Sequence, residues 1–374
     1  MDTIAIAPAG MGAGSGLLDG LRARIETELE PLVQEIDAGH YPASVLRSLG
    51  GAGLFDRHLA ATAGFGGPDL PLAIAAMALV GETCMSTAFC TWCQDACAWY
   101  LEQSANASLR ARMQPGLGSG RVLGGTGLSN PVKAVAGIEK FKLRATRADG
   151  GYVVSGVLPW VSNLGPGHLF GTVFESTEKP EHKIMALVEC GQPGVEIRQN
   201  AHFVALEGTA TYSLLFRRAF IADDMLLADP APELMRRIRP SFILLQTGMG
   251  LGVIGACIRL MREADVTHAA TNQYLPVRPD AVEERLGALR ERIFALARTP
   301  TETSADFIRA VLEARLATSE LTLEATGATV MHSGARGYLE HSAVSRRQRE
   351  GNFVALITPS VRHLRMELAR MGRH

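Results

Sequence analysis

Residues 143–174 read LRATRADGGYVVSGVLPWVSNLGPGHLFGTVF, and this stretch decides the fold. Short runs rich in Val, Tyr, Phe and Thr are separated by turn residues such as Asp149-Gly150-Gly151, which is typical of β-strands joined by tight turns. The pattern continues to residue 216 and predicts these strands: Leu143–Arg147, Tyr152–Val157, Leu169–Phe174, Ile184–Glu189, Val195–Gln199 and Thr211–Phe216. Short strands in such close succession indicate an all-β domain, either a barrel or a sandwich.

Both flanks of this β-rich stretch have the spacing of helices. From Leu17 to Ile36, and again after Pro230, apolar side chains recur every three or four residues, which is the period of a helix with one buried face. Further predicted helices are Pro42–Leu49, two helices within Leu72–Leu101, Glu233–Arg237, Phe242–Ala264, Ala281–Ala297, Ser304–Thr326 and Val361–Met371. We therefore predict an α+β protein with a flexible leader (1–16), an N-terminal helical domain (17–118), a middle β domain (119–228) and a C-terminal helical domain (229–374).

The composition excludes several classes of protein. The 374 residues contain 37 Lys and Arg against 38 Asp and Glu, so no excess of positive charge is present to neutralise a nucleic-acid backbone. Hydrophobic residues make up 47% and charged residues 20%, which excludes a disordered chain. Six cysteines are too few for a disulfide scaffold, and Asp2 stands where a secretory signal carries positive charge. We expect a cytoplasmic protein with reduced cysteines.

One segment has the length of a membrane span. Ser241–Ile258 holds 18 residues without a charge, but Gln246, Thr247 and four glycines lower its hydrophobicity. We predict a buried helix and no membrane span. The same segment contains Gly250-Leu-Gly252-Val-Ile-Gly255, which fits the G-x-G-x-x-G motif. Because no βαβ pattern follows it, we favour close packing of buried helices over a dinucleotide-binding fold.

Two further clusters have structural interpretations. Cys84, Cys90, Cys93 and Cys97 include only one C-x2-C pair, and they lie in an apolar helical stretch. Zinc sites use paired cysteine knuckles in loops, so we expect buried thiols and no metal. The basic run Arg346-Arg347-Gln-Arg349 is interpreted as a solvated face or an interface. An anion site for a phosphate-bearing ligand is the alternative.

Two segments of the middle domain carry more specific information. Thr126-Gly-Leu-Ser129-Asn-Pro131 and Pro159-Trp160-Val-Ser162-Asn163 together resemble a loop and a hairpin of the acyl-CoA dehydrogenase superfamily of flavoproteins. Leu46–Pro71 and the turn Gly334-Ala-Arg-Gly337-Tyr338 also resemble regions of that superfamily. The resemblance covers nearly the whole chain. It implies an acyl-CoA dehydrogenase-like fold with N-terminal helices, a middle β domain and a C-terminal helical bundle.

The resemblance also implies a flavin cofactor, FAD or alternatively FMN. Matched to the superfamily by position, Ser129 lies at the pyrimidine end of the flavin, Ser162 hydrogen-bonds the flavin N5, and Trp160 packs against the ring. Hydroxyl and backbone N–H donors at these places stabilise the reduced flavin. The implied cofactor-binding residues are Leu128, Ser129, Trp160, Val161, Ser162 and Gly334.

The sequence departs from the superfamily at the catalytic base. The usual glutamate stands in a Tyr-Glu-Gly-Thr motif, and counting from Gly337-Tyr338 places Thr358 in its slot. A threonine cannot abstract an α-proton at neutral pH. Glu350, which precedes a glycine, is the alternative base, but the count places it where the superfamily has Arg-Asp-Ala. No acid stands near Pro240-Ser241, where other members carry theirs.

Contacts to acyl-CoA and to FAD are altered as well. The loop that touches pantetheine in the superfamily is two residues shorter here, at Val132-Lys-Ala134. The Arg-x-x-Phe-Gly motif, which reaches the FAD of a neighbouring subunit, appears as Thr271-Asn-Gln-Tyr274-Leu, and Met331 replaces a glutamine. The superfamily nevertheless implies a homodimer or homotetramer.

Three hypotheses follow from this pattern. The first is a flavin-dependent oxidoreductase that oxidises an acyl thioester of CoA or of a carrier protein, or a related small substrate, with a relocated base. The second is a two-component flavin monooxygenase supplied by a flavin reductase. The third is a binding or structural homologue without turnover. The first hypothesis implies an electron-transfer partner in place of the reductase.

Overall fold

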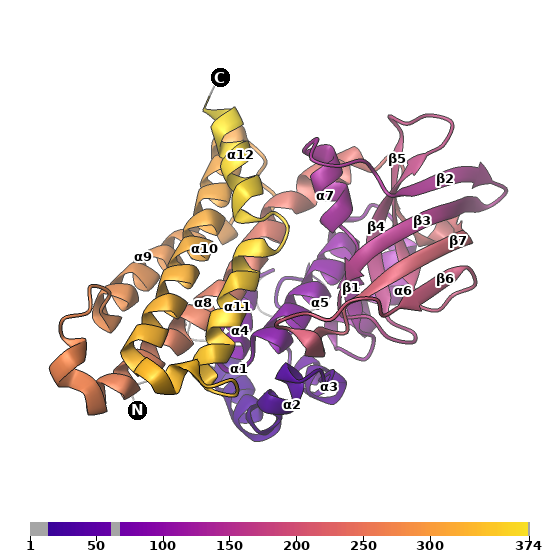
Figure 1. The fold of residues 1–374 in the computed structure, drawn as a ribbon. Coiled ribbons are helices and arrows are strands. Elements are labelled where there is room, and N and C mark those ends of the chain that lie inside the picture. The colour runs from indigo at the N-terminus through magenta and orange to yellow at the C-terminus, as the bar shows by residue number, and fades with distance from the viewer. Residues whose placement is uncertain (1–13, 61–67, 373–374) are drawn as a thin grey trace.

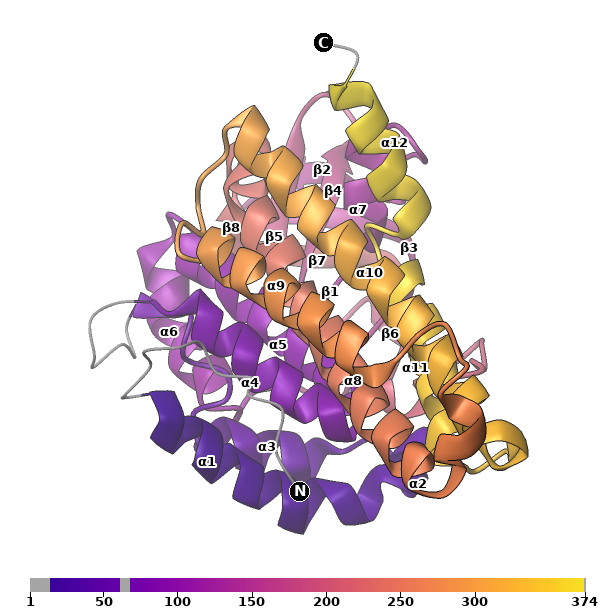
Figure 2. The ribbon, with the colours of Figure 1, turned by 90° about the vertical axis from the view of Figure 1, so that its left-hand side faces the viewer.

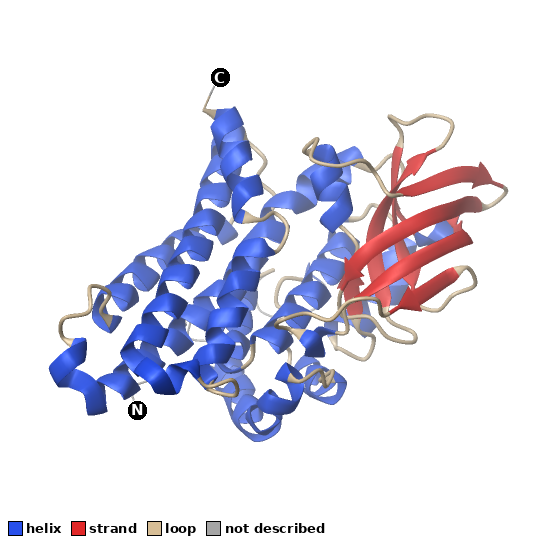
Figure 3. Cartoon of the chain, in the orientation of Figure 1, coloured by secondary structure: helices blue, strands red, loops and turns tan. Residues whose placement is uncertain are grey.

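The computed structural model describes residues 14–60 and 68–372. The predicted leader lies outside the described residues up to position 13, and its last residues are already helical, because α1 (Gly14–Arg24) begins there. Most of the glycine-rich loop before Pro71 also lies outside the described residues. Helices, a sheet and further helices follow one another along the chain, so the predicted α–β–α order is confirmed (Figure 1, Figure 3).

The N-terminal segment contains two long buried helices, α4 (Leu70–Thr83) and α5 (Met85–Gln103). Both are apolar on nearly every side, which is typical of helices at the centre of a large protein. The Asp69 carboxylate accepts a hydrogen bond from the Leu72 N–H at 2.9 Å and so caps the start of α4. The shorter elements around them are η1 (Ile25–Leu29), η2 (Glu30–Leu32), α2 (Val33–Asp37), α3 (Ala43–Gly51) and α6 (Ala107–Gly118).

The middle segment forms one eight-stranded, mostly antiparallel sheet in the order β6-β7-β3-β2-β4-β5-β8, with β1 paired in parallel to β4. Its strands are β1 (Gly124–Thr126), β2 (Leu143–Ala148), β3 (Gly151–Val161), β4 (Leu169–Ser176), β5 (Lys183–Glu189), β6 (Val195–Arg198), β7 (Tyr212–Ala222) and β8 (Leu226–Ala228). Helix α7 (Ser129–Val135) and the turns η4 (Glu207–Thr209) and η5 (Asp223–Met225) connect them. Every predicted strand is confirmed, whereas β1 and β8 are too short to show a pattern.

The C-terminal segment is built around α8 (Pro232–Asn272), which packs against α4, α5 and α10. The sequence predicts two separate helices here, because a proline in a helix interior removes a hydrogen bond. The structure instead continues the helix through Pro240, which is buried. The other helices are α9 (Pro279–Ala297), α10 (Ala305–Ser333), η6 (Gly334–Tyr338), α11 (Ala343–Leu356) and α12 (Val361–Met371). Figure 2 shows α9 and α10 side by side over α8.

The glycines of α8 allow its neighbours to approach closely. A Cβ atom added to Gly252 would collide with the Ala78 carbonyl of α4, and one added to Gly250 would collide with Thr318 of α10. The motif therefore serves helix packing, as predicted, and does not form a dinucleotide-binding loop. By length and composition α8 resembles a membrane span, but its most apolar window is entirely buried inside the protein, as in the core helix of a globular domain.

Candidate functional site

A cavity of about 450 Å³ lies where the three segments of the chain meet. Its walls come from α5, the ends of β1 and β3, loop 203–206, α8, α11 and the turn that follows α11. This volume lies in the range of sites for small molecules and cofactors. The predicted residues Ser129, Trp160, Ser162 and Thr358 all line it, although they are up to 229 residues apart in the chain.

Two hydroxyl groups meet at one wall of the cavity. The Ser129 Oγ, at the first residue of α7, is 3.0 Å from the Thr358 Oγ1, in the turn after α11. The hydrogen bond joins the β segment to the C-terminal helices across the cavity. Thr358, which occupies the slot of the usual base, therefore faces the site but offers only a hydroxyl.

A second group of hydroxyls lies at the end of β3. The Ser162 Oγ is 2.6 Å from the Thr211 Oγ1, which is in turn 2.7 Å from the Thr209 Oγ1. Ser162 also forms a β-bridge with Thr126. The adjoining Gly125 is required for this approach, because a Cβ atom there would collide with the Ser162 carbonyl. These hydroxyls can each donate or accept a hydrogen bond, and they line the same cavity.

Trp160 presents its indole to the cavity and is 59% exposed. Its φ is 56°, and Asn163 has a φ of 63°, so the chain around Ser162 adopts a conformation that side chains other than glycine rarely take. Hydrogen bonds to Asn163 hold it: the Tyr41 hydroxyl donates to its Oδ1 at 2.6 Å, and its Nδ2 donates to the Gly124 carbonyl at 2.7 Å. Backbone strain held in this way is concentrated at functional sites.

No carboxylate or imidazole lines the cavity among residues 14–60 and 68–372. The titratable side chains in its walls are Lys133, Arg349, Arg362 and Cys93. Burial raises the pKa of the Cys93 thiol well above its ordinary value, so the thiol stays protonated at neutral pH. The described residues thus place no carboxylate, imidazole or thiolate in the cavity walls.

Two of the cations at the cavity wall are paired. The Arg349 guanidinium donates to both carboxylate oxygens of Asp37, at 3.0 and 2.6 Å, and to the Val204 carbonyl at 2.9 Å. It thereby ties the loop over the cavity to α2. The Lys133 Nζ lies 3.2 Å from the Glu139 carboxylate.

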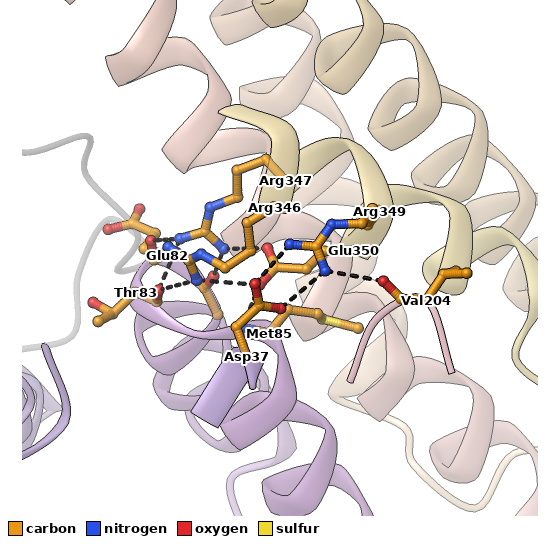
Figure 4. Close-up of polar contacts among 10 residues, drawn as sticks. Asp37, Glu82, Thr83, Met85, Val204, Arg346, Arg347, Arg349 and Glu350 are labelled. Atoms are coloured by element: carbon orange, nitrogen blue, oxygen red, sulfur yellow. Dashed lines mark hydrogen bonds and ion pairs between the residues drawn. The ribbon is translucent and has the colours of Figure 1, made fainter. Parts of the chain in front are cut away.

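Glu350, the alternative base, does not line the cavity and is 2% exposed. Its carboxylate accepts hydrogen bonds from Arg347 at 2.7 Å, from Arg346 at 3.2 Å and from the Met85 N–H at 3.4 Å (Figure 4). The two arginines also donate to the Thr83 carbonyl, each at 3.0 Å. Glu350 thus belongs to a buried ion cluster at the end of α4.

The helical period explains this placement. On α11, Arg349, Asn352, Phe353 and Leu356 repeat every three or four residues and face the cavity, whereas position 350 points about 100° away from position 349. The prediction of a solvated face for the basic run is wrong for Arg346 and Arg347, which are 8% and 2% exposed.

Three other predicted cofactor-binding residues lie outside the walls of the cavity. Leu128 and Val161 are each 2% exposed and contribute to the two hydrophobic cores. Gly334 follows the end of α10 with a φ of 57°, and a Cβ atom there would meet no other atom within 4 Å. A role of these residues in cofactor binding stays a prediction.

The sequence does not single out the aromatic residues of the cavity. Phe89, Trp92, Phe242 and Phe353 line it, and so does the hydroxyl of Thr211. Aromatic residues at helical spacing look like core residues in a sequence, so no signal separates them from their neighbours. Only their convergence from α5, α8 and α11 identifies them.

Comparisons with known proteins agree with this architecture. Residues 15–121 match the family model described as Acyl-CoA dehydrogenase, N-terminal domain. Benzylmalonyl-CoA dehydrogenase of Aromatoleum aromaticum is 26% identical over 189 residues, so the match spans about half of each protein, 50% of this chain and 49% of the relative. The human mitochondrial short-chain specific acyl-CoA dehydrogenase is 24% identical over 359 residues, covering 91% of this chain and 85% of the relative.

Solved structures share the whole fold. Butyryl-CoA dehydrogenase from Megasphaera elsdenii superposes with a TM-score of 0.89 at 18% identity, and all of both chains is covered. Dibenzothiophene monooxygenase from Paenibacillus sp. A11-2 gives a TM-score of 0.80 at 17% identity, covering 95% of this chain and 96% of the other. The fold is therefore shared by dehydrogenases and by a monooxygenase.

Residues 15–121 are thus similar in sequence to the N-terminal domain of acyl-CoA dehydrogenases, and the whole chain has the fold of a solved acyl-CoA dehydrogenase. The resemblance predicted from the sequence motifs is confirmed as similarity to acyl-CoA dehydrogenases in sequence and as their fold over the whole chain. The described residues place no carboxylate in the walls of the cavity.

Proposed function

We propose that the protein binds a flavin in the cavity and acts as the oxygenase component of a flavin monooxygenase. The observation that carries this proposal is the absence of any carboxylate or imidazole from the cavity walls within the described parts of the chain. Oxidation of an acyl thioester requires removal of an α-proton by a general base. When bound, a flavin supplies two-electron chemistry, and its reduced form can activate O2. Activation of O2 does not depend on a general base that removes an α-proton.

The residues of the cavity fit an isoalloxazine ring. A planar, partly exposed indole at Trp160 faces the space where a ring would pack. The hydroxyls of Ser162 and Ser129 lie at separate walls, and each can donate to a ring nitrogen or oxygen. We propose FAD as the cofactor, with FMN as the alternative, because structural neighbours have been solved with each. Extraction and chromatography of the bound flavin distinguish the two.

A second candidate is favoured by the sequence relatives, several of which are dehydrogenases of CoA esters by name. As an acyl-thioester dehydrogenase the protein would need a base from outside the cavity walls. The partners also differ: a flavin reductase serves the monooxygenase, and an electron-transfer protein serves the dehydrogenase. In either case we propose a homodimer or homotetramer. We also propose a cytoplasmic location, which is supported by the six cysteines being unpaired.

The experiment compares the wild-type protein with Thr358→Glu. The purified protein is loaded with flavin and mixed anaerobically with a panel of acyl-CoA thioesters, and the flavin absorbance is followed. We expect no bleaching by the wild type and a gain of bleaching in Thr358→Glu, which places a carboxylate in the cavity. Under an atmosphere of isotopic O2, with NADH, a flavin reductase and a panel of oxidisable substrates, the oxygen label should enter a product.

Two results would overturn the proposal. One is anaerobic bleaching of the wild-type flavin by any thioester. The other is NADH consumption that leaves no label in any product of the substrate panel. Failure to retain flavin at all would reject both candidates and support a binding or structural role.

A further inference from the structure

The cavity is lined by four aromatic rings, from Phe89, Trp92, Phe242 and Phe353, which we call the aromatic box. Phe89 and Trp92 are stacked at 5.7 Å with 10° between their planes. Phe353 meets Phe89 edge to face at 4.8 Å, and Phe242 meets Trp92 in the same way at 5.0 Å. Three helices therefore contribute rings to one continuous aromatic wall.

The aromatic box offers no free hydrogen-bonding group. The only polar atom among the four side chains is the Trp92 Nε1, and it donates to the Phe242 carbonyl at 3.2 Å. The neighbouring Cys93 thiol is protonated, because burial raises its pKa, and it behaves as a small apolar group. The hydroxyls of Ser129, Thr358 and Ser162 line the same cavity and supply its polar groups. A ligand in this cavity therefore has an apolar end in the box and its polar end near these hydroxyls.

The rings are held in place by burial. Phe89, Trp92 and Phe242 are 6%, 3% and 3% exposed, and their mutual ring contacts fix their planes relative to one another. A wall of fixed ring faces and edges discriminates between guests. An aromatic guest gains offset-stacked or edge-to-face contacts beyond the area it buries, whereas a saturated guest of the same carbon skeleton gains only the buried area. A flat, rigid guest also loses little conformational freedom on binding.

We infer that the substrate carries an aromatic ring system and places it in the aromatic box. This inference rests on the proposed function, because the box adjoins the proposed flavin site and would hold the group to be oxidised. It names the substrate class as a small arene, or a compound with an aryl end, whose polar atoms face the Thr358 hydroxyl.

The test measures binding without turnover. Flavin-loaded protein is titrated in a calorimeter with 2-naphthol and with decahydro-2-naphthol, which has the same carbon skeleton but no aromatic ring. We expect 2-naphthol to bind about ten-fold more tightly, since this ratio corresponds to the contribution of one or two aromatic pairs.

Variants locate the preference. Phe89→Leu and Phe353→Leu keep an apolar side chain but remove a ring of the box, and each should lower the ratio of the two affinities by about three-fold. The matched control is Phe174→Leu, which makes the same change in the core of the sheet, 5.7 Å from Tyr152. It should leave the ratio unchanged, and circular dichroism checks that all three variants are folded.

The outcomes separate this inference from the proposed function. Equal or tighter binding of decahydro-2-naphthol, no binding of either compound, or an unchanged ratio in both box variants overturns the aromatic box as a specificity site. If 2-naphthol binds as expected while no product takes up isotopic oxygen, the box stands and the monooxygenase assignment fails. If label enters a saturated substrate and 2-naphthol does not bind, the monooxygenase assignment stands and the aromatic box fails as a specificity site.

Discussion

Replacing Glu350 by glutamine distinguishes a structural ion cluster from a catalytic base. Glu350 is 2% exposed and accepts hydrogen bonds from Arg347 at 2.7 Å, Arg346 at 3.2 Å and the Met85 N–H at 3.4 Å. The amide introduced by Glu350→Gln would have one acceptor oxygen and no charge, so two buried guanidinium groups would lose their counter-charge. Removing one partner of a buried ion pair costs about 3–5 kcal/mol.

The carbonyl groups at the end of α4 limit this loss. Arg347 donates to the Gly81 and Thr83 carbonyls, each at 3.0 Å, and to that of Glu82, and these groups lie at the negative end of the helix dipole. They remain in place in Glu350→Gln, so we expect a loss near the lower limit, about 3 kcal/mol in the free energy of unfolding. Equilibrium urea unfolding followed by circular dichroism measures it.

The matched control is Glu324→Gln. Glu324 also binds an arginine through both oxygens, at 2.7 and 2.8 Å from Arg285, but the two side chains are 36% and 53% exposed. Exposed pairs contribute about 0–1 kcal/mol, so this variant should unfold almost as the wild type does. The reasoning is refuted if Glu350→Gln is as stable as Glu324→Gln, or if it retains wild-type stability but loses catalytic turnover.

Further predictions concern pH, the flavin site and the loop over the cavity. Burial, partly offset by nearby arginines, raises the pKa of Glu82 to about 7. The folded state therefore keeps a proton that the unfolded state releases near pH 4.5. As the pH rises between these two values, the free energy of unfolding should fall by about 3 kcal/mol. Glu82→Gln should remove this decline in urea unfolding series between about pH 4 and pH 8, and an unchanged pH dependence would contradict it. Ser162→Ala should weaken flavin binding by about five-fold in an absorbance titration, because one hydrogen bond to the ring is lost; affinity equal to that of the wild type would show that this hydroxyl does not contact the flavin. Asp37→Asn should lower the free energy of unfolding by about 2 kcal/mol, since Arg349 loses a charge-assisted pair that is only 17–28% exposed, and unchanged unfolding would mean that water replaces the pair.

The positions of the strands can be read from the sequence because they depend on local pattern. The runs that predict strands over residues 143–216 begin within one residue of β2 to β7, although β3 and β7 extend to Val161 and Ala222, beyond the predicted ends. The end of a helix depends less on local pattern. Pro240 resembles a helix boundary in the sequence, yet α8 continues through it because α4, α5 and α10 enclose the helix.

The sequence predicts residues of the candidate site only where they belong to a recognisable motif. Ser129, Trp160, Ser162 and Thr358 follow from matching short motifs and counting, and all four line one cavity. Phe89 and Phe353 belong to no such motif. In a sequence, an aromatic residue at helical spacing looks the same whether it faces a core or a cavity.

Glu350 is the opposite case, in which a motif points to a residue outside the cavity. With the glycine that follows it, Glu350 resembles part of the catalytic motif. Its carboxylate is directed by helical rotation toward Arg346 and Arg347, and away from the cavity face of α11. Which way a residue on a helix points is fixed by the helix as a whole, and a motif of two letters does not contain that information.

The sequence by itself determined the α–β–α order, the resemblance to the acyl-CoA dehydrogenase superfamily and the presence of Thr358 where that superfamily has a glutamate, because periodicity, turn residues and motif counts are properties of the chain alone. Only the tertiary structure decided that no other carboxylate of the described residues takes the place of that glutamate in the cavity, and that rings from α5, α8 and α11 converge in its walls. Both are statements about distance between segments far apart in the chain, and such distances are set by packing.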